Sequence, residues 1–144
     1  MKTVSSFLIL LLPLIMQSCG FVYERHLTGN YYLIAVDTKE DMDVCYHQPE
    51  DDAPYTGITG ASVYAVGYDD DFILVKAYRA LKDSMGVSLP RYDRHTTEYY
   101  IIPVNNAQEA WEAQENKFGA FDEEAFEVRR KELGVPDDIT FKKL

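Results

Sequence analysis

A thiol and an imidazole lie two residues apart at Cys45 and His47. Residues i and i+2 of an extended strand point to the same face. A Cys–His pair can supply a thiolate nucleophile or half of a metal site. Cys45 and His47 alone complete neither a catalytic site nor a metal site, and no spacing in the sequence forces His26 or His95 toward them. The pattern leaves two interpretations open: a small hydrolase or thiol enzyme that uses Cys45 and His47, or a buried cysteine beside a surface histidine.

Carboxylates occur in three runs, at residues 37–43, 50–52 and 69–71. Calcium binds several carboxylates held close together. The first run lacks the glycine at position six and the glutamate at position twelve of an EF-hand loop. Aspartates between two β-rich segments are typical of a turn. We expect no metal site and no cofactor, and calcium binding by an acidic run is the alternative.

The segment 80–96 gathers positive charge in a chain with 14 Lys and Arg against 24 Asp and Glu. Arginine offers a planar fork for carboxylates and phosphates. We expect a binding surface for an envelope protein or an anionic ligand at Arg91, Tyr92, Arg94 and His95. The alternative is that these charges pair with the acidic surface of the same domain. A connection of this length without clear structure is often mobile or functional.

Tyrosines supply a second indication of binding, because tyrosine is enriched at interfaces. Eight of the 11 lie on or beside expected strands: Tyr31, Tyr32, Tyr64, Tyr68, Tyr78, Tyr92, Tyr99 and Tyr100. They could also simply complete a small core. The sequence contains no GxSxG, HExxH, P-loop or GxGxxG motif, so we assign no catalytic residue. The net charge of -10 argues against nucleic acid as a partner.

Ten uncharged residues, Phe7–Met16, follow the basic start of the chain. As a helix they would span about 15 Å, which is too short for a bilayer core of about 30 Å and suits a secretory signal. The tetrapeptide Met16-Gln17-Ser18-Cys19 resembles the lipobox of a type II lipoprotein signal peptide. That resemblance implies cleavage after residue 18 and lipid attachment to Cys19. An ordinary secretory signal with an incidental Cys19 is the alternative.

The resemblance also implies an address and a domain plan. A lipid-anchored protein would lie in the cell envelope. The residue after Cys19 is Gly20 and not the aspartate of the inner-membrane retention signal, which favours the outer membrane of a Gram-negative bacterium. Multiple acyl chains hold a protein stably at a membrane. We expect a cleaved signal at 1–18, lipidated Cys19 with a short tether at 19–30, and one α+β domain at 31–144.

Strand-forming segments precede helix-forming ones, which indicates an α+β fold. Composition and spacing predict strands at Tyr31–Asp37, Asp41–Gln48, Ala61–Tyr68, Phe72–Arg79, Thr97–Val104 and Ile139–Lys142. A capping box of Asn106 and Glu109 predicts a helix over Ala107–Asn116. Asp122 and Gly134 bound a second helix. We expect a single antiparallel, curved sheet of about five strands with both C-terminal helices packed on it.

The motifs VGYDDDFIL, YYII and FDEEAFEVRRKELGV follow one another after the signal. Together they resemble a group of small bacterial lipoproteins of unknown function. The resemblance brings no activity, cofactor or catalytic residue. We expect a membrane-anchored binding or interaction module of the cell envelope. An envelope enzyme using Cys45 and His47, and a purely structural lipoprotein, are the alternatives.

Overall fold

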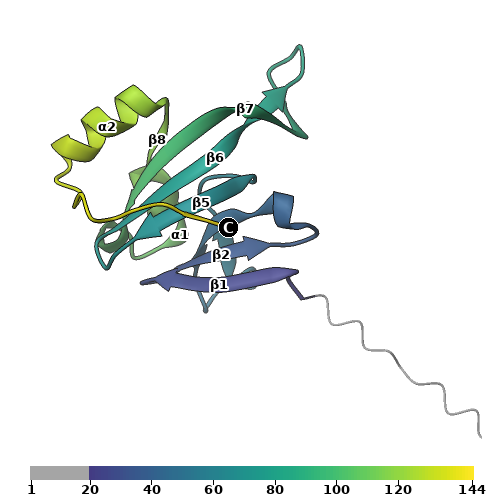
Figure 1. Ribbon diagram of the computed structural model, residues 1–144. Coiled ribbons are helices and arrows are strands. Elements are labelled where there is room, and N and C mark those ends of the chain that lie inside the picture. The colour runs from purple at the N-terminus through teal and green to yellow at the C-terminus, as the bar shows by residue number, and fades with distance from the viewer. Residues whose placement is uncertain (1–19) are drawn as a thin grey trace, which may run out of the picture.

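The computed structural model describes residues 20–144, so the signal and the lipidation expected at Cys19 lie outside the described residues. The described chain forms two antiparallel sheets (Figure 1). The first sheet has the order β1-β2-β3-β4. Its strands are β1 (Tyr23–Thr28), β2 (Tyr31–Ala35), β3 (Asp43–His47) and β4 (Tyr55–Gly57). The short 3-10 helix Lys39–Asp41 joins β2 to β3.

The second sheet has five strands in the order β8-β7-β6-β5-β9. They are β5 (Val63–Tyr68), β6 (Phe72–Lys82), β7 (Ser88–Pro103), β8 (Phe118–Phe121) and β9 (Lys142–Lys143). The predicted hairpin is confirmed: Asp69 accepts backbone hydrogen bonds from Asp71 (2.8 Å) and Phe72 (2.8 Å) in the turn. The α+β class fits, but the expectation of a single sheet is wrong.

The larger sheet is covered on both faces, which explains why apolar residues occur at both the odd-numbered and the even-numbered positions of its central strands. Ile73 and Val75 enter a core shared with the first sheet, where Leu33 and Val44 contribute from the other side. Leu74 points the opposite way into a second core with Phe126 of α2 (Glu123–Glu132). In Figure 1, α2 lies on the side of the five-stranded sheet away from β1 and β2.

The two helices have different roles. In α2 the predicted cap is confirmed, since Asp122 accepts from the Ala125 backbone N–H at 2.8 Å. Helix α1 (Ala110–Asn116) begins later than expected. The predicted capping box of Asn106 and Glu109 is wrong, because Glu109 is itself the N-cap. Glu112 accepts from the Gln108 backbone N–H at 2.7 Å, and residues 104–106 form a 3-10 helix. Ala110 and Ala113 bury α1 against the core between the sheets, so the helices do not pack on one common face.

Strand β1 occupies much of the segment that the sequence assigned to a tether. Tyr23 pairs with Ala35, and His26 pairs with Tyr32. Folded structure therefore begins near residue 23 rather than 31. All strand pairings and both cores of the described structure form within residues 20–144. A chain starting at Gly20 contains every one of these contacts.

The segment 80–96 is not structureless. Strands β6 and β7 extend through it and form an arm, defined here as residues 79–96, that projects from the body (Figure 1). Pairing in the arm is irregular: Tyr78 pairs with Thr97, but the next residue, Arg79, pairs with Asp93. Residues 94–96 therefore form a bulge in β7, and bulges re-aim side chains. The expectation of a connection without clear structure over 80–96 is therefore wrong.

None of the helices within residues 20–144 is long and apolar enough to cross a membrane.

Candidate functional site

The bulge in β7 places Arg94 at the junction of the two sheets. Asp93 holds the bulge together, because its carboxylate accepts from the His95 backbone N–H at 3.0 Å and from the Thr96 hydroxyl at 2.6 Å. The hydroxyl and amide hydrogen bonds favour the charged carboxylate and lower the pKa of Asp93. Arg94 then reaches the first sheet and forms an ion pair with Glu40.

The two sheets also meet through the backbone. The N–H of Val63 in β5 donates to the carbonyl of Met42 at 2.9 Å. Just before it, buried Ser62 adopts a positive φ of 81°. Its hydroxyl donates to the Tyr78 carbonyl at 2.7 Å. Satisfying that hydroxyl inside the junction offsets the cost of burying it.

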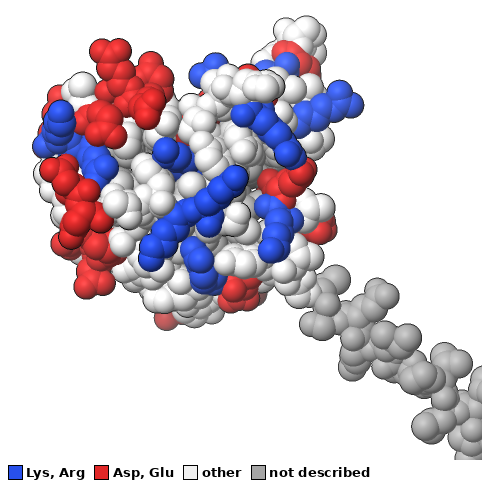
Figure 2. Space-filling view, in the orientation of Figure 1, with Lys and Arg blue, Asp and Glu red and all other residues white. Residues whose placement is uncertain are grey.

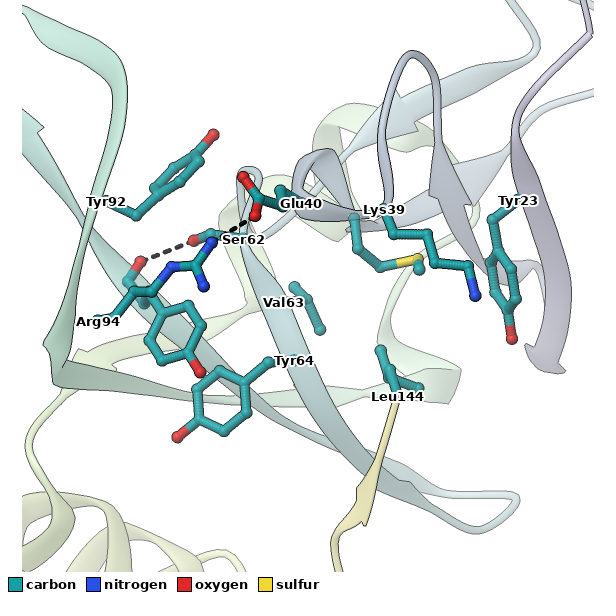
Figure 3. A pocket seen from close by; sticks show the side chains of 11 residues that line it. Tyr23, Lys39, Glu40, Ser62, Val63, Tyr64, Tyr92, Arg94 and Leu144 are labelled. Atoms are coloured by element: carbon teal, nitrogen blue, oxygen red, sulfur yellow. Dashed lines mark hydrogen bonds and ion pairs between the residues drawn. The ribbon is translucent and has the colours of Figure 1, made fainter.

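A cavity of about 230 Å³ opens at this junction, and we call it the junction cavity. Figure 3 shows Tyr92 and Arg94 of the arm on one side, and Tyr23 and Lys39 of the first sheet on the other. Its lining residues are Tyr23, Lys39, Glu40, Met42, Ser62, Val63, Tyr64, Tyr78, Tyr92, Arg94 and Leu144. Four tyrosines and two cations therefore surround one small space.

Aromatic rings form much of the cavity wall. Tyr64 and Tyr78 are stacked, with ring centroids 4.3 Å apart and planes inclined by 18°. The Tyr64 hydroxyl is fixed by Thr97 Oγ1 at 2.8 Å. Lys39 Nζ lies 5.8 Å from the centroid of the Tyr23 ring, within the range of a cation–π contact. The wall thus presents a stacked pair of rings and one cation, Lys39, over the Tyr23 ring.

Charges around the cavity act on Tyr92. Its pKa is raised, first by burial and then by Asp41, Asp43 and Glu40. Like any tyrosine with a pKa of about 10 or above, Tyr92 is protonated at neutral pH, so its hydroxyl is available as a donor. Arg94 and Lys39 supply the positive charges of the lining, and Glu40 supplies the carboxylate. An anionic group entering the cavity would compete with Glu40 for the Arg94 guanidinium.

The structure brings together only two of the four predicted binding residues. Tyr92 and Arg94 line the junction cavity, whereas Arg91 and His95 are exposed and are not part of its wall. Tyr23, Lys39 and Glu40 were missed, because Tyr23 lay in the supposed tether and the other two in an acidic run. No local pattern in the sequence indicates that the acidic run at 37–43 lies next to Arg94 of the arm, which follows it by more than 50 residues.

A larger hollow of about 890 Å³ lies beside the arm and shares Tyr78 and Tyr92 with the junction cavity. Part of its wall is a polar network, in which Glu98 pairs with Arg79 at 3.2 Å and accepts from the Tyr100 hydroxyl at 3.1 Å. Burial and Glu98 raise the pKa of Tyr100. The junction cavity contains two of the predicted binding residues, Tyr92 and Arg94, whereas the larger hollow contains only Tyr92, so we take the junction cavity as the candidate site.

Cys45 and His47 do share a face of β3, since Val44 and Tyr46 between and beside them enter the core. The thiol is buried, and burial, followed by the effect of Asp43, raises the pKa of Cys45 to about 12. Such a thiol is protonated at neutral pH, which opposes nucleophilic chemistry. The His47 ring packs between aromatic neighbours, 5.4 Å from Tyr32 and 4.8 Å from Tyr55.

The acidic runs are used within the fold. Asp69 caps the β5–β6 turn, and Asp41 accepts from the Thr38 backbone N–H at 3.1 Å. Asp43 accepts from the Thr59 hydroxyl at 2.9 Å, while burial raises its pKa. Across residues 20–144, no three His, Cys, Asp or Glu side chains form a group that could hold a metal ion.

One family model matches the chain over residues 28–144, and its description is "Protein of unknown function (DUF3997)". The match covers the five-stranded sheet, both helices and the first sheet from the end of β1. No curated protein and no solved structure matches the chain.

Proposed function

The chain belongs to this family of proteins of unknown function, and from that premise we propose that it is a binding module of the bacterial cell envelope, held at the outer membrane by a lipid on Cys19. The proposed occupant of the junction cavity is an anionic group with a flat or apolar body, carried by an envelope protein or a small ligand. The cavity is the observation that carries the proposal.

The composition of the cavity wall supports an anionic occupant. Arg94 offers a guanidinium that pairs only with Glu40 among the described residues, and arginine binds carboxylates and phosphates through a planar fork. Lys39 adds a second positive charge. The stacked Tyr64 and Tyr78 rings offer apolar surface to the body of the same ligand.

The size of the cavity limits what enters it. Drug-sized ligands occupy clefts of about 300–1,000 Å³, and this cavity holds about 230 Å³. A single ring with one anionic substituent, or one side chain of a protein partner, matches that space. Recognition of one anchoring group by a cavity of this kind is typical of a binding module.

Benzoate, phenyl phosphate and benzyl alcohol form a matched set of probes, because they share a ring and differ in charge. The experiment follows the tyrosine ring signals by NMR during titration with each probe. We expect benzoate or phenyl phosphate to shift the signals of Tyr64, Tyr78 and Tyr92. Tyr68 lies outside the cavity and serves as the reference.

Two variants separate charge recognition from general ring binding. Arg94→Ala should weaken the binding of the anionic probe about tenfold, as expected for loss of a charge-assisted hydrogen bond. Glu40→Gln should strengthen it, because the competing carboxylate is removed. Equal shifts with benzyl alcohol and benzoate would contradict the proposed anionic occupant.

A further inference from the structure

Apolar side chains are concentrated at the tip of the arm. Met85 is 86% exposed and Val87 is 59% exposed. Leu81 and Leu89, one on each strand behind the turn, are exposed as well. Isolated exposed apolar residues are ordinary, but a contiguous group of them marks an interaction site.

Hydrogen bonds within the turn at the tip keep Met85 and Val87 exposed. Asp83 Oδ1 accepts from the backbone N–H of Met85 at 2.8 Å and of Val87 at 2.9 Å. Gly86 supplies a φ of 81°, which other residues rarely adopt. Its N–H donates to the Asp83 carbonyl at 3.0 Å. The outward position of Met85 and Val87 is therefore specified by the turn itself.

Positive charge flanks the apolar tip. Lys82 precedes the turn and Arg91 follows it, and neither forms a salt bridge within residues 20–144. The two aspartates of the arm are occupied: Asp83 by the turn and Asp93 by the bulge. An apolar tip with basic residues behind it matches surfaces that enter the headgroup region of an anionic membrane.

The arm lies on the same side of the molecule as the start of the described chain. In Figure 1 the arm projects at the upper right and β1 begins at the lower right, whereas α2 lies at the upper left. Figure 2 shows Lys and Arg side chains on the arm and across the middle of the face in view, with some Asp and Glu among them, whereas Asp and Glu are most numerous over α2. Phe21 and Val22, just before β1, are exposed apolar residues.

We propose that the tip of the arm, Leu81, Met85, Val87 and Leu89, inserts into the headgroup region of an anionic lipid surface, with Lys82 and Arg91 contacting lipid phosphates. The inference rests on the proposed location at a membrane, but it does not require the lipid on Cys19. It fixes how the domain sits: the arm and the start of β1 face the bilayer, and α2 faces away.

Sedimentation with lipid vesicles tests this placement in a chain that starts at Gly20 and so lacks Cys19. Circular dichroism first verifies that each protein is folded. Vesicles of phosphatidylethanolamine and phosphatidylglycerol provide the anionic surface, and phosphatidylcholine vesicles provide the neutral one. We expect the anionic vesicles to bind the protein, with affinity that falls as salt rises.

Matched substitutions identify which residues contact the vesicle. Met85→Asp should lower vesicle affinity about tenfold or more, whereas Val128→Asp, at an exposed apolar residue of α2, should leave it unchanged. Lys82→Glu with Arg91→Glu should remove the preference for anionic lipid, and Lys131→Glu on α2 should not. Equal binding by the Met85→Asp and parent proteins, or no binding to anionic vesicles, would overturn the proposal and favour a protein partner for the arm. Benzoate titration of the cavity is independent of these results, so failure of either proposal is recognised separately.

Discussion

The guanidinium of Arg94 forms an ion pair with the carboxylate of Glu40, and this contact joins the bulge of β7 to the 3-10 helix of the first sheet. The two side chains are 62% and 67% exposed. Exposed ion pairs contribute between about 0 and 1 kcal/mol to stability. The pair is therefore poorly placed to hold the sheets together and well placed to exchange partners with an incoming anion.

Replacing Arg94 with alanine should separate stability from binding. We expect the free energy of unfolding to fall by less than about 1 kcal/mol, while the cavity loses most of its affinity for benzoate. Urea denaturation measures the first quantity and NMR titration the second. Arg129→Ala, which removes the ion pair with Glu132 on α2, is the control and should leave benzoate binding intact. A loss of several kcal/mol in the Arg94 variant would assign that residue a structural role.

The buried thiol of Cys45 should be unreactive in the native protein. Its pKa is raised to about 12 by burial and by Asp43, so almost none is thiolate at pH 8. Iodoacetamide should modify Cys45 in urea and leave it unmodified without urea over the same period. Rapid alkylation of the folded protein at neutral pH would instead revive the thiol-enzyme alternative.

The same thiol predicts a loss of stability at alkaline pH. In the unfolded chain the thiol loses its proton near pH 9, whereas in the native protein it keeps the proton until about pH 12. Its contribution to stability is therefore fully present below pH 9 and is lost as the pH rises toward 12. Urea denaturation at pH 8 and pH 10 should show a smaller decrease for Cys45→Ala than for the parent. Identical decreases in both proteins would contradict the raised pKa.

The second core should depend on one aromatic side chain of α2. Phe126 is fully buried among Leu74, Tyr99 and Ile101. Phe126→Ala should lower the free energy of unfolding by about 3–5 kcal/mol. Val128→Ala, two residues further along the exposed side of the same helix, should change it by less than about 0.5 kcal/mol. Similar losses from both substitutions would mean that α2 does not cover the sheet as described.

Lipid attachment remains a prediction from residues 16–19. Cys19→Ala should abolish incorporation of labelled palmitate and shift the protein from the membrane fraction to the soluble fraction. Weak residual membrane binding would be expected from the arm, and Met85→Asp in the same chain should remove it. Persistence of the palmitate label in the Cys19→Ala protein would refute the anchor.

Local signals predicted the elements that depend on local chemistry. The Asp69–Asp71 turn and the Asp122 cap of α2 were correct, because their hydrogen bonds connect residues within three positions. The division into two sheets was missed, since it depends on the junction at Met42 and Val63. Consecutive apolar residues such as Ile73 and Leu74, whose side chains point to opposite faces, did indicate that both faces of the sheet are covered.

The site was predicted only in part for a similar reason. Tyr92 and Arg94 were identified from composition, because basic residues stand out in an acidic chain. Glu40, the partner of Arg94, is 54 residues away from it in the chain, and the bulge that brings the two together cannot be recognised from strand periodicity. The arm was mistaken for a loop because irregular pairing and Pro90 remove the alternation expected of a strand.

Photocrosslinking from the cavity in intact cells tests the central claim most directly. Tyr92 is replaced with p-benzoylphenylalanine in the full chain, and Tyr68, exposed outside the cavity, is replaced as the matched position. We predict a discrete crosslinked species in the membrane fraction from position 92, absent from position 68 and lost when Arg94→Ala is added. Identical species from both positions, or a species from position 92 that survives Arg94→Ala, would contradict recognition by the junction cavity.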